Sequence, residues 1–119
     1  MKRLIHGLIA AACFLMASSV LAHATLQSST PTNGSTLATA PTEIRLQFTE
    51  PIEITFSSVK LAGPGANPIK TYKAKADKED AKSIIVPVPA LPAGAYKAQW
   101  STVGRDGHRV KGEISFTVK

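Results

Sequence analysis

The residues best able to do chemistry in this chain are two histidines that lie far apart in the sequence. His23 directly follows Val20-Leu21-Ala22, which has the small residues of a signal-peptidase site, and His108 ends the run Asp106-Gly107-His108. Cleavage after Ala22 would make His23 the N-terminus, so that it offers an α-amino and an imidazole nitrogen together. With one imidazole and one carboxylate from the distant run, three nitrogens and an oxygen can surround one ion, a tetragonal set that suits Cu(II).

The first 22 residues predict a secretory signal peptide. Lys2 and Arg3 supply a positive start, a largely apolar run follows, and small residues precede the cleavage site. The run is interrupted and is short for the ~20 apolar residues of a membrane-spanning helix. We therefore divide the chain into a leader, 1–22, and one exported domain, 23–119. The residues alone leave a second cut open, because Ala22-His23-Ala24 is also an A-x-A pattern and cleavage after Ala24 would discard His23.

The domain contains neither cysteine nor methionine, since Cys13, Met1 and Met16 all lie in the leader. No disulfide can stabilise it, and no soft sulfur ligand is present for Cu(I), so a copper site here would be a Cu(II) site. Loss of the two leader cations lowers the formal charge from +6 to +4. The lysines between residues 70 and 82 are interleaved with acidic residues and few aromatic ones, which favours a solvated strand edge over a nucleic-acid-binding surface.

Alternation of apolar and polar residues predicts an all-β fold. No stretch of the domain keeps helical periodicity over three turns, and Trp100 shares its alternating face with Tyr96 and Ala98, which predicts a core position for it. Together these patterns indicate a Greek-key β-sandwich of immunoglobulin-like type. About seven short strands are expected, at 24–29, 44–49, 54–61, 69–76, 83–88, 96–103 and 114–118.

The loop between the last two predicted strands would carry Asp106 and His108. Gly104 and Gly107 permit tight backbone geometry there, and the i, i+2 spacing can place both side chains on one side of an extended segment. Taken singly, an Asp-Gly pair is also typical of a polar hairpin turn, and a histidine at a chain end is also typical of a solvated terminus. The two features together favour a metal site more strongly than either does alone, because His23 and His108 are the only histidines after the leader.

The domain resembles the CopC copper-resistance proteins, which are periplasmic copper binders of bacteria. The resemblance covers nearly the whole domain and implies a cupredoxin-like or immunoglobulin-like sandwich with Cu(II) at its end, in a chain that starts at His23. Besides that histidine, it rests on Ser28-Ser29-Thr30-Pro31, Gly34-Ser35, Ile44-Arg45-Leu46-Gln47-Phe48-Thr49-Glu50, Ala93-Gly94-Ala95-Tyr96-Lys97-Ala98-Gln99-Trp100, Asp106-Gly107-His108, Gly112 and Phe116-Thr117-Val118.

The resemblance implies one Cu(II) ion, bound by His23 through its amine and imidazole and by Asp106 and His108. Glu50 matches a carboxylate that lies near copper in some relatives, which would make it a weak axial ligand or an outer neighbour of the ion. An exposed acid at a strand end is an equally good interpretation of Glu50. Some relatives have a methionine-rich segment that forms a Cu(I) site, but residues 61–68 here contain no methionine, which favours a single Cu(II) site.

We therefore expect a monomeric, non-enzymatic periplasmic protein that binds Cu(II) for resistance, sequestration or delivery. The resemblance implies a membrane copper transporter of the CopD type as its partner. Lytic polysaccharide monooxygenases also hold copper with an N-terminal histidine, but Asp106 would fill a coordination position that oxygen needs, and no flat aromatic face is evident. A metal-free exported interaction domain is the second alternative, and it predicts that replacing His23 or His108 has no measurable effect.

Overall fold

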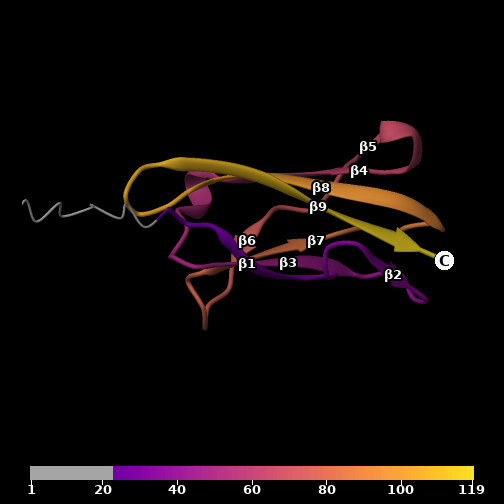
Figure 1. The fold of residues 1–119 in the computed structure, drawn as a ribbon, viewed down its shortest axis with the longest axis horizontal. Helices are drawn as coiled ribbons and strands as arrows, with labels where there is room; N and C mark the ends of the chain where they lie inside the picture. Colours follow the sequence, from indigo (N-terminus) through magenta and orange to yellow (C-terminus); the bar gives the residue numbers. More distant parts are fainter. Residues whose placement is uncertain (1–22) are drawn as a thin grey trace, which may run out of the picture.

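The computed structural model describes residues 23–119, and the predicted signal peptide, 1–22, lies outside the described residues. Within residues 23–119, nine strands form two sheets that pack face to face (Figure 1). The four-stranded sheet has the order β1-β3-β7-β6, with β1 at Leu26–Thr30, β3 at Glu43–Phe48, β7 at Ser83–Pro87 and β6 at Lys75–Ala76. The five-stranded sheet has the order β2-β9-β8-β4-β5, with β2 at Ser35–Leu37, β9 at Arg109–Val118, β8 at Gly94–Val103, β4 at Ser58–Ala62 and β5 at Pro68–Ile69.

The core lies between the two sheets and is built from the apolar members of each alternating strand. Trp100 is 7% exposed and meets Phe48 of the other sheet edge-on, with 6.1 Å between ring centroids. Tyr96 stacks on Phe116 at 5.4 Å, and its hydroxyl donates a hydrogen bond to the carbonyl oxygen of Pro92 at 2.5 Å. The predicted β-sandwich and the predicted core position of Trp100 are both confirmed.

The predicted strand at 54–61 is wrong in its first half. Residues Ile54–Phe56 form a short 3-10 helix, η1, and only the part from Ser58 onward pairs with β8. The turn closes because the Phe56 and Ser57 amides donate to the carbonyl oxygens of Glu53 and Ile54. Phe56 is therefore 63% exposed rather than part of an inward-facing row.

The predicted edge strand at 69–76 is also wrong, because this segment passes from one sheet to the other. Its start, Pro68–Ile69, pairs with β4, whereas its end, Lys75–Ala76, pairs with β7. A second 3-10 helix, η2 at Pro64–Ala66, precedes it. This division, together with the short strand β2 parallel to β9, accounts for nine strands where about seven were expected.

Two features bring the start of the domain and the β8–β9 loop to the same end of the sandwich (Figure 1). Strands β8 and β9 pair without interruption from Gly94 opposite Val118 to Val103 opposite Arg109, which leaves residues 104–108 as the loop. The segment after β3 bonds to the end of β8, since Ile52 bridges Gly104 and the Glu53 amide donates to the Val103 carbonyl at 2.8 Å. Among the described residues, we find no helix with the length and apolarity needed to cross a membrane.

Candidate metal centre

The four-stranded sheet holds the residues around His23 in place. Ala24 is 3% exposed and belongs to the core, so it anchors the chain immediately after the histidine. The Thr49 amide donates to the Thr25 carbonyl at 2.8 Å. The Thr49 hydroxyl accepts from the Thr25 amide at 3.1 Å and donates to the His23 carbonyl at 3.4 Å. These contacts fix the backbone of His23 beside the end of β3, unlike a free, solvated terminus.

The β8–β9 loop is closed by its own hydrogen bonds and presents the other two side chains. The Gly107 amide donates to the Gly104 carbonyl at 3.0 Å, and the Gly104 amide donates to the His108 carbonyl at 3.2 Å. Gly107 has a φ of +83°, which L side chains rarely adopt, so glycine is the residue suited to this position. Asp106 accepts from the His108 amide through Oδ1 at 3.0 Å, which leaves its Oδ2 facing the two imidazoles.

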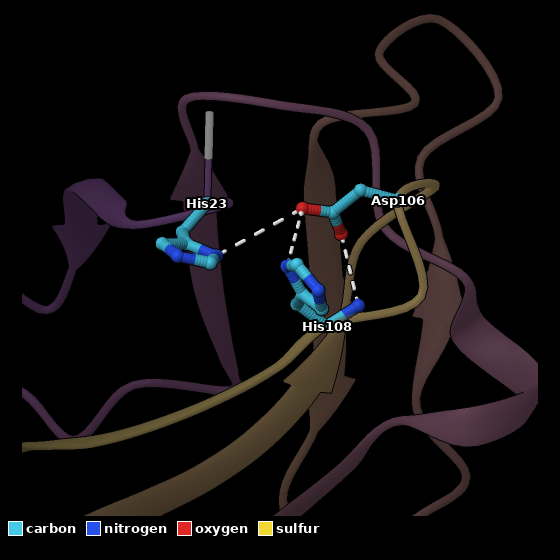
Figure 2. Close-up of side chains that lie close together, drawn as sticks. All are labelled: His23, Asp106 and His108. Atoms are coloured by element: carbon cyan, nitrogen blue, oxygen red, sulfur yellow. Dashed lines mark hydrogen bonds and ion pairs between the residues drawn. The ribbon is translucent and has the colours of Figure 1, made fainter. Parts of the chain in front are cut away.

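The three predicted ligands converge on a single point at the end of the sandwich (Figure 2). Asp106 Oδ2 lies 3.2 Å from Nδ1 of His108 and 3.8 Å from Nδ1 of His23, and the two imidazole centroids are 5.0 Å apart. One donor atom from each residue lies within 4.8 Å of the other two. Ligand atoms at ~2 Å from an ion stand a few ångströms apart, so small side-chain rotations would close this set around a metal.

The centre is open to solvent on one side. The side chains of His23 and His108 are 47% and 46% exposed, whereas that of Asp106 is 28% exposed. The carboxylate is thus the least exposed of the three side chains, and both imidazoles are accessible to an ion in solution. Imidazole nitrogens with a carboxylate oxygen form an N,O donor set that suits divalent copper, nickel or zinc, with copper bound most tightly by intrinsic affinity.

Glu50 is not brought into this group. It lies two residues beyond the end of β3 and is half-buried, while the cluster found within residues 23–119 consists of His23, Asp106 and His108. Its role as an axial or outer carboxylate stays a prediction. The sequence did not predict a supporting role for Thr49, which is one of the polar residues in the alternation at 44–49. Its contacts reach back 24 and 26 residues, and no local pattern signals such a pairing.

Comparison with known proteins decides the family. Residues 26–119 match the sequence model of the CopC domain. The chain belongs to the CopC family. Protein YobA of Escherichia coli K12 is 41% identical over 106 residues, which cover 88% of this chain and 86% of YobA. The CopC resemblance seen in the sequence is therefore confirmed.

Two further relatives of this CopC-family chain carry copper in their names. The crystal structure of PcoC, a methionine-rich copper resistance protein from Escherichia coli, has a TM-score of 0.75 at 35% identity and covers 82% of this chain and all 100% of that one. Copper transport protein CutJ of Bacillus subtilis is 33% identical over 98 residues, which cover 82% of this chain but 18% of CutJ. PcoC is described as methionine-rich, whereas residues 23–119 here contain no methionine.

Proposed function

We propose that this CopC-family protein binds one Cu(II) ion in the periplasm through His23, Asp106 and His108, for copper resistance or delivery. The observation that carries the proposal is the convergence of the only two histidines of the domain on one carboxylate, although 84 residues separate them. The copper resistance and copper transport relatives support the choice of metal.

Signal-peptide removal completes the proposed centre. Cleavage after Ala22 frees an amine on the residue whose imidazole already faces Asp106, so His23 can chelate the ion with two nitrogens. Both nitrogens bind only when deprotonated, so Cu(II) affinity falls as the medium is acidified. The carbonyl of His23 and the amide of Thr25 are bonded to Thr49, which supports a fixed position for this chelating residue.

A single Cu(II) centre fits the donor atoms of this chain better than a two-site carrier. Residues 61–68 form the end of β4, η2 and the start of β5 and contain no sulfur. Cu(I) prefers soft sulfur ligands, so reduction should weaken binding at an N,O centre and promote release. Similar affinity for Cu(I) and Cu(II) would contradict this part of the proposal.

The protein is proposed to deliver copper as a monomer rather than to catalyse oxidation. A CopC-like region makes up part of CutJ, which supports a copper transporter of the CopD type as the receiving partner. Asp106 lies beside both imidazoles and would occupy a position that an oxygen-activating copper enzyme leaves open. A reductant-driven oxidation assay on polysaccharide tests the alternative, and oxidised products would favour the enzyme.

Native mass spectrometry of protein recovered from the periplasm, with one equivalent of Cu(II) added, tests the proposal. We expect a mass that starts at His23 and retains one copper ion, and loss of that ion in His108→Ala. Glu50→Gln is the matched variant: retained affinity would place Glu50 outside the ligand set. A mass starting at Thr25, or a His23 start without bound copper, would contradict the proposed centre.

A further inference from the structure

One edge of the five-stranded sheet is only half covered. β2 pairs with the far end of β9, where Ser35, Thr36 and Leu37 lie opposite Phe116, Thr117 and Val118 (Figure 1). Between residues 109 and 113, β9 pairs with β8 on one side, and no backbone partner among residues 23–119 lies on the other side. An uncovered edge of this length is a template on which another extended chain can pair.

The part of β9 that β2 covers shows which backbone groups of residues 109–113 point toward the open edge. The Ser115 amide donates to Asn33 Oδ1 at 2.9 Å and its carbonyl accepts from the Gly34 amide at 2.7 Å, so both groups of Ser115 point away from β8. In a strand paired antiparallel without a bulge, these directions alternate from residue to residue. Glu113, Lys111 and Arg109 therefore present amide and carbonyl groups to the open edge.

The side chains along this edge set the chemistry of an incoming strand. On the outer face, Arg109 donates to the Ser101 hydroxyl at 2.6 Å, and Lys111 has no ion pair among the described residues. Glu113 already has a cationic neighbour, since its Oε1 lies 3.7 Å from Lys97 Nζ. Charge complementarity therefore favours acidic residues opposite Arg109 and Lys111, because opposite charges across a strand pair are stabilising.

The inner face of the same edge is apolar. Gly112 has no side chain, and the Trp100 ring lies over it so closely that a Cβ there would stand 2.3 Å from Cζ2. A residue of an added strand opposite Gly112 would border this indole and the half-buried Val110. The edge thus fits an extended segment in which acidic residues alternate with apolar ones.

We propose that the open edge of β9, Arg109–Glu113, docks an extended acidic segment of a partner protein by strand addition. In a second copy of this chain, the register that pairs all three edge residues sets Lys111 opposite Lys111 and Arg109 opposite Glu113, so self-pairing creates one like-charge contact that an acidic segment avoids at Lys111. Arg109 directly follows His108, and Lys111 lies ~10 Å from His108 along the strand, so the docked segment ends beside the proposed metal centre. Docking does not require copper, whereas a role of this docking in copper transfer rests on the proposed function.

Amide hydrogen exchange by NMR tests the docking on the copper-free, exported protein. The probe is a synthetic ten-residue peptide of alternating glutamate and valine, and a lysine–valine peptide is its control. We expect the acidic peptide at saturation to slow exchange at Arg109, Lys111 and Glu113 by ~10-fold or more, with little change at Val110 and Gly112, which already bond to β8. Slowing without this alternation, slowing at another strand, or equal binding of the lysine peptide would overturn the proposal.

Two variants separate backbone pairing from charge. Lys111→Pro removes one edge amide and no bond to β8, so it should abolish the protection. Lys111→Gln keeps the amide and should weaken peptide binding several-fold, whereas Lys60→Gln on β4 should leave it unchanged. If Lys111→Pro does not fold, a peptide N-methylated on its pairing amides replaces it and should not bind. A doubled mass of the free protein in sedimentation that Lys111→Pro abolishes would instead assign the edge to self-association.

Discussion

Thr49 is the residue whose replacement tests most directly how the proposed metal centre is assembled. Its hydroxyl bonds the Thr25 amide at 3.1 Å and the His23 carbonyl at 3.4 Å, while its backbone amide bonds Thr25 independently. Thr49→Val has nearly the same shape and removes only the hydroxyl. Each hydrogen bond contributes ~0.5–1.5 kcal/mol net, and the longer one lies at the weak limit, so we assign ~1–2 kcal/mol to the hydroxyl.

That free energy should be divided between lost Cu(II) affinity and lost stability of the metal-free fold, and it sets the upper limit of the affinity loss. Without the hydroxyl, the chain before Ala24 can fray, and binding must then order it again at an entropic cost. A loss of ~1–2 kcal/mol corresponds to ~5- to 30-fold weaker binding. Competition titration against a Cu(II) chelator measures the affinity loss, and thermal unfolding of the metal-free protein measures the remainder.

Thr117→Val is the matched control for this experiment. Thr117 is exposed on β9, and its side chain makes no hydrogen bond within residues 23–119. We expect this variant to bind Cu(II) as the unmodified protein does. Unchanged affinity in Thr49→Val, or an equal loss in both variants, would refute the argument that the Thr49 hydroxyl positions His23.

Three further perturbations have outcomes set by the structure. Asp106→Asn keeps an acceptor for the His108 amide but removes the charge between the imidazoles, so Cu(II) affinity in the same titration should fall by at least ~10-fold. Gly112→Ala forces a methyl group against the Trp100 ring and should lower the free energy of unfolding by ~1–3 kcal/mol in urea titrations followed by tryptophan fluorescence. The pKa of Asp77 is lowered by a hydrogen bond from the Glu79 amide and then by one from Arg45, and the pKa of Asp80 is lowered by a hydrogen bond from the Ser83 hydroxyl. The stability that these two carboxylates contribute is therefore present above their unfolded pKa and is lost as pH falls through their lowered folded pKa. Arg45→Ala should therefore move the midpoint of acid unfolding to higher pH, as followed by circular dichroism.

The strands with clean alternation could be predicted from the sequence, while those defined by distant partners could not. Residues 96–100 and 114–118 alternate strictly and lie in β8 and β9, because each apolar residue faces the same core. Residues 69–76 have a plausible strand composition, but their two ends pair with different sheets. The partner strand determines which sheet each end of such a segment joins, and local composition does not identify that partner.

The residues of the proposed site stood out in the sequence, but the contacts that hold them in place did not. His23 and His108 stood out because histidine is scarce in the domain, and Asp106 because it shares a loop with His108. The buried methyl of Ala24 and the contacts of Thr49 fix where His23 lies, yet both are ordinary residues at ordinary positions. Their effect comes from tertiary packing across 24 residues or more, which periodicity does not encode.

The two halves of the donor set belong to different sheets, and this division has a consequence for release. His23 is fixed through Thr49 to β3, whereas Asp106 and His108 lie in the loop that joins β8 to β9. An ion bound by both halves would link the sheets and stabilise the folded state, since the unfolded chain keeps these ligands far apart. A segment docked on the open edge of β9 would reach the loop ligands first, because Arg109 adjoins His108. We therefore expect ligand exchange to begin at Asp106 and His108, with His23 the last residue to release the metal.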